Sequence, residues 1–127
     1  INFIKGNSFE VLKNLKEKFD LIHIDGTHKN KFVTKEFYKC MNLIKNDEID
    51  FIFDDVDNVK VLIKNILTTY SIKEKYSPTC VFKNLHLKIS FPKSKILFFI
   101  KKCTFIIKNL LSYTFLKIVK LSKFKKI

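Results

Sequence analysis

Along the first 70 positions of the chain, short runs of apolar residues alternate with segments in which apolar residues recur every three or four positions. Short apolar runs, typical of buried strands, occupy residues 1–5, 19–24 and 49–53. Between and after them, apolar positions three and four residues apart predict three helices. The first begins at Ser8, which we expect to be its N-cap, and the others cover residues 29–45 and 59–67. The order strand, helix, strand, helix, strand, helix predicts an α/β fold, with parallel strands and helices on the faces of the sheet.

The pattern changes after Tyr70. Residues 71–76 and 80–91 are strand-like and predict a terminal antiparallel hairpin at the edge of the sheet. Pro92 ends this pattern, and residues 93–127 are rich in Phe, Ile, Leu and Lys, without acids and without a clear period. Their longest apolar run, residues 96–100, is far shorter than the roughly 20 residues that cross a membrane. Two interpretations of this basic apolar tail stay open: a segment that lies on a membrane surface, or an extension without a selected role.

The length of the chain limits its organisation. With 127 residues it holds one small domain, but it is too short for a complete two-halved nucleotide-binding fold. We expect a domain over residues 1–91 and a lysine-rich apolar extension over residues 92–127. Since the chain begins with Ile1 inside a strand-like run, we also expect it to be a piece of a longer protein.

The net charge of +13 comes from the second half of the chain. Residues 1–70 hold 11 lysines and 11 acids, whereas residues 71–127 hold 14 lysines and only one acid, Glu74. The composition favours Lys, Asn, Ile and Phe, which is typical of a codon bias, and it includes no arginine. Because arginine is the preferred residue for bidentate recognition of bases, we expect no sequence-specific nucleic-acid partner.

Cysteine usage and the start of the chain bear on the compartment. Cys40, Cys80 and Cys103 lie far apart with no CxxC pair, which is typical of reduced intracellular thiols. Residues 1–4 are too short an apolar stretch for a signal peptide, so we expect none. We expect a cytoplasmic protein, with a membrane-peripheral location as the alternative.

Carboxylates follow two of the predicted strands. Asp25 comes directly after residues 19–24, and Asp54 and Asp55 come directly after residues 49–53. Because the carboxyl ends of parallel strands share one crevice, we expect these three side chains to lie close together. Oxygen ligands of this kind select a hard divalent cation such as Mg²⁺. The plainer interpretation is that the aspartates cap turns and helix starts.

The three histidines differ in what their positions suggest. His28 follows Asp25 across a glycine turn, where an imidazole could act as general base, although a solvent-exposed loop histidine is the plainer interpretation. His23 lies within a predicted strand, so we expect it to be buried and hydrogen-bonded. His86 gives no functional signal.

Two of these segments together resemble a known family. Residues 19–28, Phe-Asp-Leu-Ile-His-Ile-Asp-Gly-Thr-His, and residues 51–55, Phe-Ile-Phe-Asp-Asp, resemble the paired strand motifs of class I S-adenosylmethionine-dependent methyltransferases. The resemblance is closest to methyltransferase family 24 and extends to metal-dependent sugar and catechol O-methyltransferases. Gly6-Asn7-Ser8 is similar to the Gly-Asp-Ser turn that approaches the adenine of the cofactor. The resemblance covers about residues 2–67 and implies the C-terminal part of a Rossmann-like domain.

The resemblance also implies roles for particular residues. Asp25, Asp54 and Asp55 would bind the metal, with Asp25 also bordering the cofactor, and His28 would deprotonate the acceptor. Asn7 and Ser8 would border the adenine of S-adenosylmethionine.

Three departures from the family pattern affect what the resemblance implies. Asn7 replaces the usual aspartate, and Asn46-Asp47 replaces the usual Pro-Gly or Gly-Gly turn. The glycine-rich loop of the family is missing, because the only glycines are Gly6 and Gly26. Without it, backbone N–H groups cannot approach the methionine part of the cofactor closely, so we expect the chain to bind the cofactor poorly.

We therefore expect a fragment of an S-adenosylmethionine-dependent, Mg²⁺-assisted O-methyltransferase that acts on a hydroxyl of a small molecule or sugar. Two alternatives stay open. One is an inactive remnant of such an enzyme, and the other is a peripheral membrane or polyanion-binding module that acts through residues 93–127.

Overall fold

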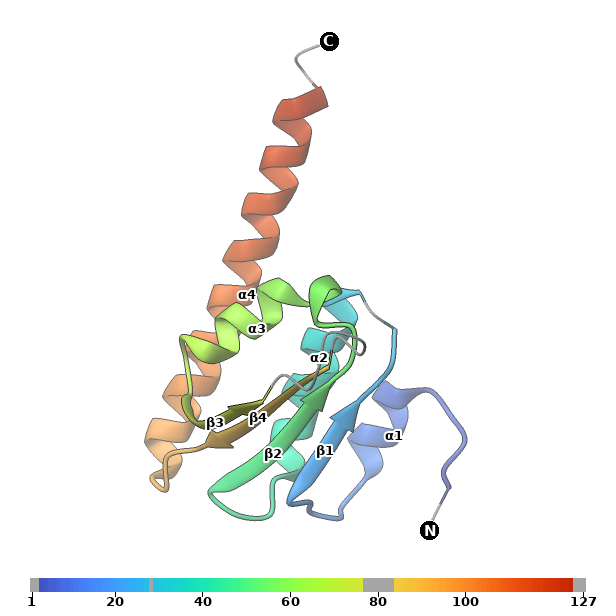
Figure 1. The fold of residues 1–127 in the computed structure, drawn as a ribbon, viewed down its shortest axis with the longest axis vertical. Coiled ribbons are helices and arrows are strands. Elements are labelled where there is room, and N and C mark those ends of the chain that lie inside the picture. Colours follow the sequence, from blue (N-terminus) through green and yellow to red (C-terminus); the bar gives the residue numbers. More distant parts are fainter. Residues whose placement is uncertain (1–2, 28, 77–83, 125–127) are drawn as a thin grey trace.

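The computed structural model describes residues 3–27, 29–76 and 84–124, with the backbone alone for residues 115–124. Its principal elements, shown in Figure 1, are α1 (Ser8–Asn14), β1 (Leu21–Ile24), α2 (Asn30–Cys40), β2 (Glu48–Phe53), α3 (Lys60–Leu67), β3 (Ser71–Tyr76), β4 (Leu85–Ser90) and α4 (Lys95–Phe124). Two short 3-10 helices, η1 (Met41–Leu43) and η2 (Val56–Asn58), follow α2 and β2. The predicted α/β class is confirmed.

A four-stranded mixed sheet with the order β1-β2-β4-β3 forms the centre of the molecule. β1 and β2 are parallel, and their register pairs His23 with Ile52 and Ile24 with Phe53. β4 runs antiparallel to both β2 and β3, as the predicted hairpin requires. The two parallel strands therefore end at the same edge of the sheet.

The expected strand at residues 1–5 is not formed in the part that the structure describes. Residues 3–5 have no regular structure, and the side chains of Phe3 and Ile4 are 88% and 58% exposed. An isolated strand leaves its backbone groups unpaired, so apolar character alone does not hold this segment extended. The expected cap is also wrong: the side chain of Asn7, and not of Ser8, accepts a hydrogen bond from the backbone N–H of Phe9 and caps α1.

Helices pack against one face of the sheet. Along β2, Ile49, Phe51 and Phe53 are buried, because alternate residues of a strand point to the same face. The ring of Phe37 on α2 lies 4.8 Å from that of Phe51 and 5.2 Å from that of Phe105 on α4. Figure 1 shows α2 and the first part of α4 behind the sheet. The hydrophobic core therefore lies between this face and the helices.

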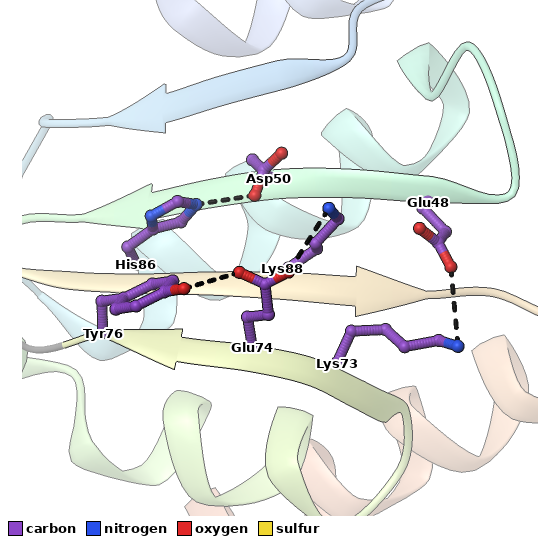
Figure 2. Close-up of polar contacts among 7 residues, drawn as sticks. All are labelled: Glu48, Asp50, Lys73, Glu74, Tyr76, His86 and Lys88. Atoms are coloured by element: carbon purple, nitrogen blue, oxygen red, sulfur yellow. Dashed lines mark hydrogen bonds and ion pairs between the residues drawn. The ribbon is translucent and has the colours of Figure 1, made fainter.

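The opposite face of the sheet, which we call the open face, carries polar and half-exposed side chains. Its members include His23 on β1, Asp50 and Ile52 on β2, and His86 and Lys88 on β4. Figure 2 shows the polar contacts on this face: the imidazole of His86 lies 2.7 Å from Asp50, and Lys88 pairs with Glu74 at 3.6 Å. Polar side chains thus hold the strands together where no helix covers them in the described part of the chain.

Residues 95–124, for which the sequence gives no clear period, form one long helix. Phe105 is only 1% exposed and joins the hydrophobic core, and the side chain of Asn65 on α3 donates a hydrogen bond to Asn109. Burial lowers the pKa of Lys102, whose ammonium lies over the ring of Tyr38. The first part of α4 therefore packs with the sheet domain, and the domain boundary at residue 92 stays a prediction. Among the helices that the structure describes, none has the length and apolar character needed to cross a bilayer.

Candidate functional site

Three possible metal ligands converge where β1 and β2 end. His23, Asp25 and Asp54 each offer one ligand atom, and these atoms lie within 4.8 Å of one another. The Nε2 atom of His23 lies 3.0 Å from Oδ1 of Asp54. We call these three side chains the ligand triad. In the described part of the chain, no other three His, Cys, Asp or Glu side chains bring their ligand atoms close enough together to hold a metal ion.

The geometry of parallel strands explains the ligand triad. His23 and Asp25 are two residues apart, so they share a face of β1 and its continuation. The parallel pairing continues past the end of β2, because the backbone N–H of Asp54 donates to the carbonyl of Ile24 at 3.3 Å. As His23 pairs with Ile52 in the register, Asp54 emerges on the same open face. The predicted proximity of Asp25 and Asp54 is therefore present.

His23 contradicts the expectation of a buried residue. Its side chain is 46% exposed, and that of Asp54 is 21% exposed. The expectation treated residues 19–24 as a strand covered on both faces, whereas no helix of the described chain covers the open face of β1. The two-residue spacing from Asp25 is the sequence signal that would have placed His23 beside the acids.

The remaining predicted metal ligand, Asp55, is not a member of the ligand triad. It precedes η2 in a left-handed backbone conformation, with φ 47° and ψ 52°. Its carbonyl accepts a hydrogen bond from the N–H of Asn58 at 2.9 Å. Aspartate is among the few residues that tolerate this conformation, and a role for its side chain in metal binding stays a prediction. His28 lies outside the described residues, so its role as a base also stays a prediction.

A cleft of about 340 Å³ adjoins the ligand triad. Its lining includes His23, Asp25 and Gly26, together with Gly6, Ser8 and Glu36. The predicted cofactor-binding residues Ser8 and Asp25 therefore share one cleft. Asn7 lies beside it as the cap of α1, and the contacts of these residues with adenine stay predictions.

Glu36 is a residue of this cleft that the sequence analysis missed. Its side chain is buried, with a relative exposure of 9%; Oε1 accepts a hydrogen bond from the hydroxyl of Ser8 at 2.6 Å, and Oε2 has no hydrogen-bond partner in the described structure. A side chain at Gly26 would place its Cβ only 3.2 Å from this Oε2 atom, so the Glu36 carboxylate would have to shift slightly to make room for it. A buried acceptor without a partner costs about 1–3 kcal/mol and calls for an explanation. A polar residue between Val33 and Phe37, on the apolar side of a predicted helix, was the available signal.

A second His–Asp pair lies on the same open face. His86 Nε2 and Asp50 Oδ1 are 2.7 Å apart, and both side chains are about one-third exposed. No third ligand joins them in the described part of the chain. This pair, drawn in Figure 2, resembles the His23–Asp54 contact in chemistry but lacks the additional carboxylate that a metal site needs.

Comparison with known proteins bears on the first half of the chain. The family model of the methyltransferase domain of family 24 matches residues 1–57. No curated protein and no solved structure matches significantly. The matched residues contain the whole ligand triad and all the described residues that line the cleft. Residues 1–57 are therefore similar to a segment of a methyltransferase domain.

Proposed function

We propose that the chain provides the acceptor side of an S-adenosylmethionine-dependent O-methyltransferase. The observation that carries the proposal is the ligand triad beside a cleft, within the segment that matches a methyltransferase domain. The methyl acceptor is a hydroxyl of a small molecule or sugar, bound in the cleft next to His23 and Asp25.

The ligand triad has the chemistry of a divalent metal site. Two carboxylates close together repel each other, and a cation offsets this repulsion. The donor set of one imidazole nitrogen and two carboxylate oxygens suits Mn²⁺ or Fe²⁺ as well as Mg²⁺, because nitrogen ligands favour transition metals over Mg²⁺. A bound divalent ion would lower the pKa of a coordinated hydroxyl.

Four residues of the chain have separate roles in the proposed reaction. Asp25 and Asp54 are fixed by the ends of two paired strands, which limits the freedom lost on binding. The free Oε2 of Glu36 can accept a hydrogen bond from a hydroxyl or amino group of a molecule in the cleft. We keep His28 as the base that takes the hydroxyl proton, so that the oxygen can attack the methyl group in line with its bond to sulfur.

The proposal assigns only part of the cofactor site to this chain. Asn7 and Ser8 would border the adenine, whereas no glycine-rich loop is present to approach the methionine portion. We therefore expect the 127-residue chain to bind S-adenosylmethionine weakly and to saturate only at high cofactor concentration.

Titration calorimetry with Mn²⁺ and Mg²⁺ tests the metal site. We expect His23→Ala and Asp54→Asn each to weaken Mn²⁺ binding at least about tenfold. His86→Ala and Asp50→Asn are the matched controls, because they remove the other His–Asp contact on the same face and should leave binding unchanged. Affinity should also fall in acid, since protons compete with the metal for these ligands.

A methyl-transfer assay tests the reaction itself. With labelled S-adenosylmethionine and a panel of sugars and catechols, the label should appear on a hydroxyl compound only when a divalent cation is present, and Asp54→Asn should abolish this transfer. Metal binding without any transfer would favour the inactive remnant. Metal binding that is equal in the triad variants and the controls would overturn the assigned site.

A further inference from the structure

The exposed side of α4 carries a continuous apolar stripe. Six large side chains, each between 52% and 75% exposed, form what we call the outer face of α4: Ile96, Phe99, Ile100, Ile107, Leu110 and Leu111. They recur three, four and seven residues apart, so they lie along one side of the helix. Scattered apolar residues on a surface are ordinary, but a contiguous stripe of this kind marks a contact site.

The domain itself does not use this side of the helix. Phe105 and Asn109, which are buried against the sheet domain, lie on the opposite side of α4. Figure 1 shows the helix extending well past the sheet and α3. Within the described residues, the outer face is therefore available to a partner while α4 stays packed in the fold.

The charges around the outer face indicate the kind of partner. At 100° per residue, Lys108 lies beyond one edge of the stripe and Lys95 beyond the other, while Lys101 and Lys102 lie nearer the buried side of the helix. Residues 95–124 contain no acid. The amines of Lys102 and Lys108 bind Asn42 and Thr68 of the domain, and they add to the positive charge of the helix.

We propose that the outer face of α4 docks onto an anionic membrane surface. An apolar stripe bordered by lysines suits the boundary between acyl chains and headgroups, where the apolar side chains enter the bilayer and the ammonium groups meet lipid phosphates. The helix lies on the bilayer and does not cross it. Anionic lipid supplies the negative charge that α4 lacks.

A second copy of the chain is the competing occupant of the stripe. Two α4 helices packed through their outer faces would bring two rows of lysines together, with no acid on either helix to pair with them. Like charges in such an arrangement are destabilising. The charge pattern therefore favours lipid over self-association.

Vesicle sedimentation tests the proposal with the 127-residue chain. Vesicles of phosphatidylcholine mixed with phosphatidylserine should carry the protein down, and vesicles of phosphatidylcholine alone should carry down much less. The double variant Ile100→Ser, Ile107→Ser should bind at least about tenfold more weakly, because two apolar side chains no longer enter the bilayer. Raising the salt concentration should also weaken binding.

Two controls make the result specific. The double variant Phe3→Ser, Ile4→Ser removes two exposed apolar side chains outside α4 and should bind like the wild type. Lys95→Gln with Lys101→Gln should reduce the preference for phosphatidylserine. Circular dichroism should give wild-type helix content for each variant, so that loss of folding is distinguished from loss of binding.

Three results would overturn the proposal. The first is equal sedimentation with neutral and anionic vesicles. The second is binding that the lysine substitutions abolish but the serine substitutions on α4 leave intact, which would indicate simple polyanion binding. The third is a stable dimer in analytical ultracentrifugation that the serine substitutions dissociate. None of these outcomes depends on whether the chain transfers methyl groups.

Discussion

Cys40 and Glu36 lie one turn apart on α2, and both line the cleft beside the ligand triad. Burial raises the pKa of the Cys40 thiol from its ordinary value of 9.0 to about 12, and the nearby Glu36 carboxylate adds to the shift. The thiol therefore stays protonated at neutral pH. Since the thiolate is the reactive form, Cys40 contributes packing and not a nucleophile to the cleft.

Alkylation of the native protein checks this conclusion. At a pH near 9.0, we expect iodoacetamide to modify Cys103, which is half-buried on α4, well before Cys40, and peptide mass spectrometry distinguishes the two sites. In urea both thiols should react at similar rates, which controls for local sequence effects. Equal rates in the native protein would show that Cys40 is accessible and ionises more readily than its burial implies.

Residue identity predicted only part of the candidate site. The aspartates at the ends of two strands could be found because strand ends are visible as abrupt stops in apolar runs. Glu36 and His23 were missed although each left a signal in the sequence, because the weight of that signal depends on which face of an element another element covers. That information is in the three-dimensional packing and not in local sequence.

At the scale of elements, α4 has apolar side chains on two opposite sides. Phe105 enters the core on one side, and Phe99 is 66% exposed on the other. Two apolar faces with lysines between them produce no simple amphipathic period, which is why the sequence did not predict this helix. Each helix of the first 70 residues has a single apolar side, and each strand is a short apolar run. Most of these helices and strands were therefore predicted.

A matched pair of substitutions compares what the two sides of α4 contribute to the free energy of unfolding. We expect Phe105→Ala to lower the free energy of unfolding by about 3–5 kcal/mol, because it leaves a cavity among Phe37, Tyr70 and neighbouring side chains. Phe99→Ala, the same change on the outer face, should alter it by no more than about 0.5 kcal/mol. Urea denaturation measures both values. Similar small effects would mean that α4 is not part of the cooperative core.

At the scale of the whole molecule, the positive charge is concentrated in the second half of the chain. The net charge of +13 makes the folded state repel itself, whereas the Lys–acid contacts of the structure are between exposed or half-exposed side chains and stabilise it little. Screening by salt should therefore reduce the repulsion among the lysines more than it weakens the attraction within the Lys–acid contacts.

The dependence of stability on salt checks this balance. Without lipid or divalent cations, we expect the midpoint of thermal unfolding to rise by roughly 2–5 °C when sodium chloride is added to a low-salt buffer. An uncharged osmolarity control such as glucose, at the same osmolarity, should produce a smaller shift. A fall in the midpoint with salt would mean that the ion pairs outweigh the net repulsion.

The one-sided cover of the sheet separates two kinds of position along β1 and β2. Ile24, Phe51 and Phe53 face the helices, while the intervening His23 and Ile52 face the other way, together with Asp54 just beyond β2. We therefore expect substitutions at alternate positions to act on different properties: one set on whether the chain folds and the other, under the proposed function, on which ligand it binds. New ligand preferences could arise in such a sheet through changes that leave its hydrophobic interior untouched.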